Sequence, residues 1–157
     1  MSRIMYVNIN VTDMDRSIAF YELIGFKLIN RWAPDRTIMH DTARMYNEAP
    51  NEDLEAALLR LGGDVASTCL DLCQWRTRPA WGSAPEQTNR VGMCRLTIAV
   101  DDPGGVVARL GKAGYEPIGE NVKMSLWEGR PPASLVAFRD PDGVFVQVVH
   151  GLDPLVG

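Results

Sequence analysis

VNINVTDMDRSIAFY, at residues 7–21, has a counterpart further along the same chain. A shift of 89 positions places Val11 on Val100 and Asp13 on Asp102 without a gap. The same shift aligns four more pairs: Ala19 with Ala108, Gly25 with Gly114, Phe26 with Tyr115, and Ile29 with Ile118. Solenoid repeats are shorter, with periods of about 20–50 residues. The pattern therefore indicates a duplicated half-domain, and a functional site is expected in the cleft between the halves.

Each copy is expected to open with a strand and a helix. Residues 5–11 alternate in the manner of a strand, and the polar side chains of residues 12–15 can cap the helix that follows. Gly25 is expected to end that helix, because glycine adopts a left-handed conformation easily. The remaining elements expected from this plan are a strand over 26–32 and, in the second copy, a strand over 95–100, a helix from about Pro103 to Gly114 and a strand over 115–119.

The second copy closes with a predicted hairpin, strands 134–138 and 144–149, joined by the RDPDG turn. The matching hairpin in the first copy is less obvious, because LEAALLRL at 54–61 has helical propensity by composition. Gly62-Gly63-Asp64 nevertheless follows as a turn, and residues 67–75 alternate again. By the logic of the duplication, we predict a strand over 56–61.

Length and spacing predict one domain over residues 1–157. Its expected parts are module one at 3–75, a linker at 76–92 and module two at 93–150, followed by a loose tail. Residues 33–53 are expected to form a loop or short helix over the open side.

Composition excludes several classes of function. The chain is 46% hydrophobic and 23% charged, as in ordinary soluble globular proteins, and its net charge of -4 argues against nucleic acid as a partner. No long apolar run or secretory leader is present, so we expect a cytoplasmic protein with no membrane partner. Cys69, Cys73 and Cys94 lie in apolar runs and are expected to be buried free thiols, because the spacing of the first two does not suit a metal-binding turn.

VNINVTDMDRSIAFY followed by Gly25-Phe26, together with FRDPDG at 138–143 before a final strand, resembles the vicinal oxygen chelate superfamily. This superfamily includes glyoxalase I, bleomycin-resistance proteins, methylmalonyl-CoA epimerase and extradiol dioxygenases. The resemblance covers residues 3–150 and implies an α+β fold. Two tandem βαβββ modules would form a cup-shaped mixed sheet with helices outside, and four inward residues would hold a divalent metal.

The four metal-ligand positions implied by the resemblance fall on Tyr6, Asp71, Arg95 and Gln147. Divalent metals need converging lone-pair donors, usually from His or carboxylate side chains, whereas Arg has no lone pair to give and stays cationic. The only histidines, His40 and His150, match none of the four positions. We therefore expect no metal and no other cofactor.

Two interpretations of these four residues remain open. Asp71 and Arg95 can form a buried ion pair that serves structure alone. Alternatively, Tyr6, Asp71, Arg95 and Gln147 form a polar floor in an apolar cup, where they bind a ligand. Trp81 and Trp127 lie in expected loops, and they are candidates for lining the mouth of the cup.

Two functions follow from this site. The first is metal-independent binding of a small apolar or aromatic metabolite, as in a sequestering protein of the antibiotic-resistance type. The second is a metal-free isomerase, epimerase, cyclase or lyase. There Asp71 would act as acid or base, while Arg95 and Tyr6 would stabilise an oxyanion. The sequence does not decide whether the protein is an enzyme. Its expected partners are a small-molecule ligand or substrate and a second copy of the chain in a homodimer.

Overall fold

The computed structural model describes residues 3–33, 44–46, 54–62, 65–77, 79–125, 128–129 and 131–151. The chain divides into two compact units, Met1–Gly82 and Ser83–Gly157. This boundary falls inside the linker predicted at 76–92. The prediction of a single domain stays a prediction.

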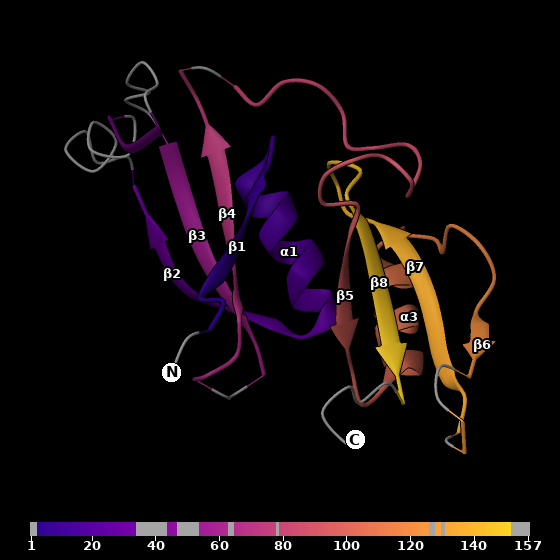
Figure 1. Ribbon diagram of the computed structural model, residues 1–157. Coiled ribbons are helices and arrows are strands. Elements are labelled where there is room, and N and C mark those ends of the chain that lie inside the picture. Colours follow the sequence, from indigo (N-terminus) through magenta and orange to yellow (C-terminus); the bar gives the residue numbers. More distant parts are fainter. Residues whose placement is uncertain are drawn as a thin grey trace. The chain divides into compact units, whose positions relative to one another are not determined.

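Unit one is a four-stranded mixed sheet with one helix on a face (Figure 1). The strands lie in the order β1-β4-β3-β2; β1 runs parallel to β4, and the other pairs are antiparallel. The elements are β1 (Tyr6–Asn10), α1 (Met14–Ile24), β2 (Phe26–Trp32), β3 (Leu54–Leu61) and β4 (Cys69–Trp75).

Unit two repeats this arrangement, with strands in the order β5-β8-β7-β6 and a single parallel pair, β5 with β8. Its elements are β5 (Arg95–Ala99), α3 (Pro103–Lys112), β6 (Val122–Met124), β7 (Ala133–Arg139) and β8 (Phe145–His150). The predicted α+β fold of two tandem βαβββ modules is confirmed.

Both helices begin at an aspartate that the duplication predicted. The Asp13 carboxylate accepts a hydrogen bond from the backbone N–H of Arg16 at 3.0 Å, and Asp102 accepts one from Gly105 at 2.9 Å. These bonds satisfy backbone donors that the first helical turn leaves unpaired.

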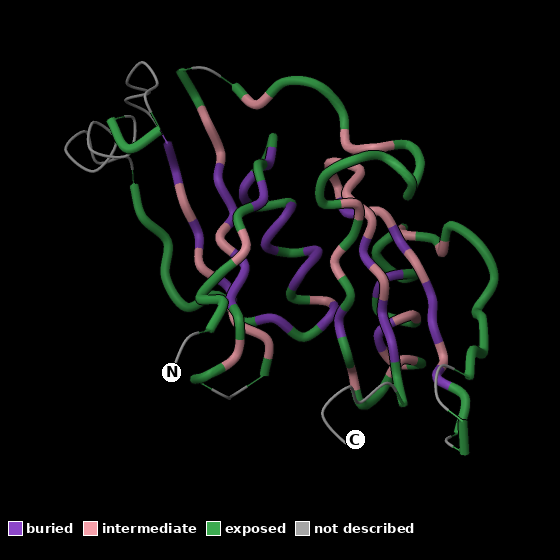
Figure 2. The backbone as a smooth tube through the Cα atoms, viewed as in Figure 1, coloured by how far each residue is buried: buried purple, intermediate pink, exposed green. Residues whose placement is uncertain are grey.

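The core of unit one lies between α1 and one face of its sheet. Phe20 and Tyr21 of α1 are fully buried, as are Ala57, Leu59 and Leu72 of the sheet. Burial alternates along β1 and over residues 55–59 of β3 (Figure 2), as expected for side chains that point to opposite faces. We call the sheet face turned away from α1 the distal face. The register places on it the even-numbered residues of β1 and β3 and the odd-numbered residues of β4.

Two predicted strands differ from the structure. The strand predicted at 115–119 is wrong, since the edge strand of unit two is β6 at Val122–Met124. Pro117 has no backbone N–H to pair, and only the N–H of Ile118 reaches the carbonyl of Ala137, at 2.9 Å. Strand β3 begins at Leu54, two residues before the predicted strand at 56–61.

Among the described helices, none has the length and apolar character needed to cross a membrane.

Candidate functional site

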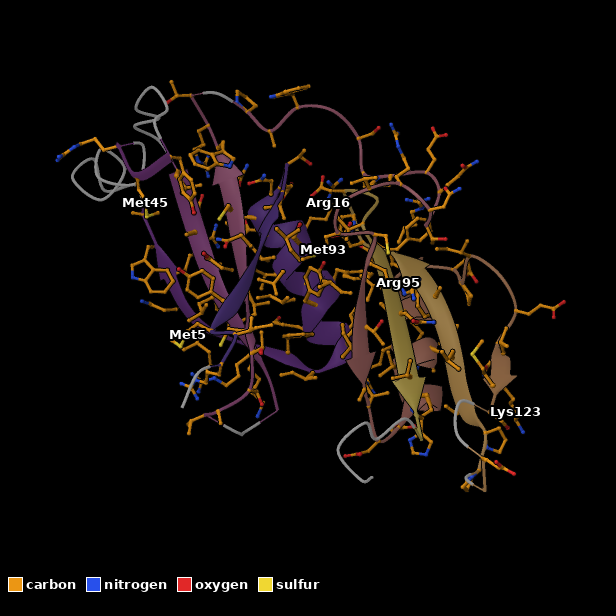
Figure 3. The ribbon with its side chains drawn as sticks, viewed as in Figure 1. Met5, Arg16, Met45, Met93, Arg95 and Lys123 are labelled. Atoms are coloured by element: carbon orange, nitrogen blue, oxygen red, sulfur yellow. The ribbon has the colours of Figure 1, made fainter. Side chains whose placement is uncertain are left out.

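The four predicted site residues occupy equivalent places in the two units. Tyr6 begins β1, and Arg95, labelled in Figure 3, begins β5. Each lies on the edge strand that pairs in parallel with the last strand of its unit. Tyr6 lies opposite Cys69 of β4, and Asp71 is two residues further along that strand. In the same way, Arg95 lies opposite Phe145 of β8, and Gln147 is two residues further along. Both Tyr6 and Arg95 are exposed, whereas Asp71 and Gln147 are partly buried.

The closest partner of Asp71 is Asn8, which the sequence analysis missed. Asn8 lies directly opposite Asp71 in the parallel β1–β4 pair, and its side-chain Nδ2 donates a hydrogen bond to Asp71 Oδ2 at 2.7 Å. The same nitrogen lies 3.7 Å from the Sγ of Cys73. The resemblance selected Tyr6, and Asn8 follows it by two residues on the same strand, so the alternation of the strand could have added Asn8 to the site.

The environment of Asp71 favours its protonated form. Burial raises the pKa of this carboxyl group above its ordinary value, and the hydrogen bond from Asn8 opposes that shift. The Cys73 thiol has its pKa raised to about 11, first by burial and second by the negative charge of Asp71. Because the thiolate is the reactive form of cysteine, Cys73 is unreactive at neutral pH.

Unit two carries a neutral version of the same pair. Thr97 lies opposite Gln147 in the parallel β5–β8 pair, and the Thr97 hydroxyl donates to Gln147 Oε1 at 3.2 Å. The carboxylate of unit one is thus replaced by an amide at the equivalent position, and the amide of Asn8 is replaced by a hydroxyl. The predicted pairing of Asp71 with Arg95, which belongs to the other unit, stays a prediction.

A tryptophan that the sequence analysis did not select lies at one end of the distal face. The indole Nε1 of Trp75 donates to Asn10 Oδ1 at 2.7 Å, which fixes the edge of the ring. Trp81, a candidate for lining the mouth of the cup, is 96% exposed and lies at the end of unit one. Trp127 lies outside the described residues.

A charged residue of the distal face also escaped the sequence analysis. Arg60 lies in β3, opposite Lys27 of β2 and Cys69 of β4. Its side-chain Nε is buried and has no hydrogen-bond partner within the described ranges. The strand pattern of LEAALLRL could have indicated its face, because Arg60 alternates with buried Leu59 and shares its face with Leu58.

The opposite face carries an ion-pair cluster, centred on Glu55. One oxygen of this buried carboxylate lies 2.5 Å from Arg31 Nε, and the other lies 2.5 Å from Arg76 Nη2. Arg31 also contacts Asp15 of α1 at 2.5 Å. The Arg76 guanidinium is the main cause that holds the pKa of Glu55 below its ordinary value, and Arg31 adds to it while burial opposes both. The cluster links α1, β2 and β3, and each of its charged side chains pairs with an opposite charge within the cluster.

The residues at the four metal-ligand positions do not fit a divalent metal. They offer one carboxylate, one phenol, one amide and one guanidinium, and the guanidinium cannot donate a lone pair. Asp71 is the single carboxylate among them. Nowhere in the described part of the chain do three or more His, Cys, Asp or Glu side chains gather as metal ligands would.

Comparisons with known proteins agree on the fold. The model of the Glyoxalase/Bleomycin resistance protein/Dioxygenase superfamily matches residues 3–148. Among solved structures, a glyoxalase family protein from Bacillus cereus aligns with a TM-score of 0.80 at 25% identity, over 98% of this chain and 96% of the other. The trypanothione-dependent glyoxalase I of Leishmania major aligns with a TM-score of 0.64 at 22% identity, over 96% and 88% of the two chains. A glyoxalase/bleomycin resistance protein/dioxygenase domain from Frankia gives a TM-score of 0.65 at 20% identity, over 97% and 99%. A comparison with curated protein sequences gives no significant match.

Proposed function

Because the chain belongs to the Glyoxalase/Bleomycin resistance protein/Dioxygenase superfamily, we propose that it binds a small apolar or aromatic molecule without a metal. The Asn8–Asp71 pair carries this proposal. The superfamily resemblance implies a metal ligand at Asp71, and there the carboxylate instead accepts a 2.7 Å hydrogen bond from a neighbouring amide. The other three positions hold a phenol, a guanidinium and an amide, so this pair would hydrogen-bond to a ligand rather than share a metal ion with them.

The surroundings of this pair support an aromatic ligand. The distal face of unit one offers apolar surface from Leu58 and an indole ring from Trp75, which Asn10 orients. Apolar surface with a few fixed polar groups is the usual composition of a small-molecule site. Under the proposal, Tyr6, Asp71, Arg95 and Gln147 supply hydrogen bonds to the ligand, while Trp81 and Trp127 cover it.

The binding proposal is tested by titrating the protein with bleomycin and with a panel of planar phenols and quinones, followed by tryptophan fluorescence. At least one compound should bind saturably, and the Asp71→Ala variant should weaken that binding about tenfold or more. Asp142→Ala, in the β7–β8 turn, is the matched control and should leave binding unchanged. Equal affinities for the parent and Asp71→Ala would place the site elsewhere.

Metal independence has its own test. The purified protein should contain far less than one divalent ion per chain, and calorimetric titration with Zn²⁺ or Ni²⁺ should show no stoichiometric site. About one ion per chain, removed by a chelator together with ligand binding, would overturn this part of the proposal.

A second candidate function is metal-free proton transfer by Asp71. The observation that favours it is the position of Asp71, a half-buried carboxyl group on the distal face between Asn8 and Leu58, and burial also raises its pKa above its ordinary value. Asp71→Asn should then abolish turnover of a bound compound while its affinity stays within about tenfold. A ligand that binds the parent protein and is never converted would contradict the enzyme function, and the binding function would then stand by itself.

The proposal also includes a homodimer. Light scattering should give about twice the 17.4 kDa mass of one chain. The mass of a single chain at every working concentration would reject this part.

A further inference from the structure

A buried nitrogen on the distal face lacks an acceptor. It is the Nε of Arg60, and no hydrogen bond or ion pair of this guanidinium occurs within the described ranges of the chain. Arg60 as a whole is only half-buried, but an N–H donor that is buried without an acceptor is unfavourable. The position therefore suits an acceptor that a ligand brings.

The neighbours of Arg60 strengthen this interpretation. In the register of the sheet, Lys27, Arg60, Cys69 and Tyr6 form one row across β2, β3, β4 and β1. Side chains opposite each other on adjacent strands have Cβ atoms about 4.5–5.5 Å apart. The row thus presents two cations and a phenol hydroxyl, all of which can donate hydrogen bonds to one anion.

We propose that the ligand of the distal face is an aromatic molecule that carries an oxyanion, and that Arg60 binds this oxyanion. Lys27 contributes a second positive charge, and Tyr6 contributes a hydroxyl donor. The planar fork of an arginine side chain matches the paired oxygens of a carboxylate, a sulfonate or a phosphate. This inference rests on the proposed binding function and narrows the class of ligand.

The rest of the face offers apolar side chains for the aromatic part. Moving along β3 from Arg60, the next side chains on the distal face are Leu58 and Ala56, and Leu54 lies opposite Trp75. At about 3.3 Å per residue, the distance from Arg60 to Ala56 is about 13 Å, enough for two fused rings.

Asp71 restricts where the oxyanion can lie. It is opposite Leu58, one step along the sheet from the Arg60 row. When ionised it repels a second anion at that step, and it can accept a hydrogen bond from a ligand hydroxyl or amine. The anionic end of the ligand is therefore directed toward Arg60 and Lys27.

The test uses two fluorescent probes that share one aromatic skeleton. Anilinonaphthalene sulfonate carries an oxyanion, and phenylnaphthylamine does not. The full-length parent should bind the sulfonate about tenfold more tightly than the neutral probe. Arg60→Gln should remove that preference and leave the affinity for the neutral probe within about twofold of the parent value. Lys27→Gln should reduce the ratio of the two affinities without removing it.

Lys123→Gln is the matched control, because Lys123 is an exposed lysine on the edge strand of the other unit. It should change neither affinity. Naphthoate and naphthyl phosphate, used as competitors, then identify which oxyanion the site prefers.

The outcomes separate the two proposals. If neither these probes nor any compound of the panel above binds, the proposed binding function fails. If the neutral probe binds and the sulfonate binds no tighter, the binding function stands and the anion site is overturned. An Arg60→Gln variant with a lower melting temperature and an unchanged probe preference would also overturn it, because Arg60 would then pair within the chain. If Arg60→Gln does not fold, the parent protein is measured at two salt concentrations. A preference for the sulfonate over the neutral probe that stays unchanged between about 0.05 M and 0.5 M salt contradicts an ionic contact.

Discussion

Asp71 shows how one side chain can oppose folding and still define a site. Its carboxyl group lies partly buried on a sheet face, where it receives one hydrogen bond from Asn8. Burial raises the pKa of this group in the folded protein above its ordinary value of 3.8. The folded state therefore binds a proton more tightly than the unfolded state does, and ionisation of Asp71 costs stability.

The first prediction follows from this sign. Replacing Asp71 by Asn removes the ionisable group and keeps an oxygen that can accept from Asn8. At pH 7 the variant should be at least as stable as the parent, and its advantage should vanish below about pH 3, where Asp71 is protonated in both states. Urea unfolding at the two pH values measures this. A variant clearly less stable at pH 7 would mean that the ionised carboxylate has a cationic partner, as the predicted pairing with Arg95 requires.

Glu55 is the opposite case, and here the charge links several elements. Its carboxylate joins Arg31 of β2 and Arg76, which follows β4, so β3 is held to its surroundings on the helix side of the sheet. The pKa of Glu55 is lowered below its ordinary value of 4.5, with Arg76 as the largest cause. Its stabilising contribution is therefore present above the unfolded pKa and lost as pH falls through the lower folded pKa.

We predict that Glu55→Gln lowers the free energy of unfolding at pH 7 by about 1–2 kcal/mol. Both arginines are partly exposed, so the value should lie toward the low end for charged hydrogen bonds. The difference from the parent should shrink as pH falls below about 4. Glu22→Gln, on α1, is the control, and an equal loss in that variant would contradict a specific role for the cluster.

The two helices allow a matched prediction, because each begins at an aspartate cap. Asp13→Ala and Asp102→Ala should each cost about 1 kcal/mol, and the Asn variants should retain most of the stability. Thermal unfolding by circular dichroism checks both pairs. A loss in one unit without the other would show that the two caps are not energetically equivalent.

At the level of elements, the duplication made most of the fold predictable. The caps, the RDPDG turn and the alternation in β1 and β5 are local signals, and all of them correspond to elements of the structure. The duplication also overrode the helical composition of LEAALLRL correctly. It failed at 115–119, because the local effect of Pro117 moved the edge strand to Val122–Met124.

The candidate site was less predictable, because its partners depend on register between strands. Asn8 and Asp71 are far apart in the sequence and become neighbours only through the parallel β1–β4 pair. The residue type of Arg60 did not indicate a place in the site, since a lone arginine in a strand usually faces solvent. Only the burial of its Nε distinguishes it.

The whole molecule consists of two units whose boundary follows Gly82. Next to that boundary, Trp81 is 96% exposed. Beyond it, Arg139 fixes the segment that enters unit two. Its guanidinium donates to the carbonyls of Pro85 and Glu86, at 2.9 and 3.0 Å, while its plane lies 3.7 Å from the centre of the Phe145 ring.

We therefore predict that limited chymotrypsin digestion of the native protein cuts after Trp81 and yields an N-terminal fragment of the length of unit one. Trp81→Ser should lose this cut and keep the same melting temperature. Mass spectrometry of the early fragments checks the position. Resistance at Trp81 in the parent would show that this side chain is covered in solution, and protection only with ligand present would support its predicted place at the mouth of the site.

The equivalent pairs Asn8–Asp71 and Thr97–Gln147 also bear on how such a protein acquires a new role. After a gene segment is duplicated, either half can change while the other keeps the ancestral task. Here both copies have an aspartate that starts the helix, yet their facing pairs differ, one acidic and one neutral. A duplicated architecture of this kind allows the chemistry of one half to change while the fold of both halves stays the same.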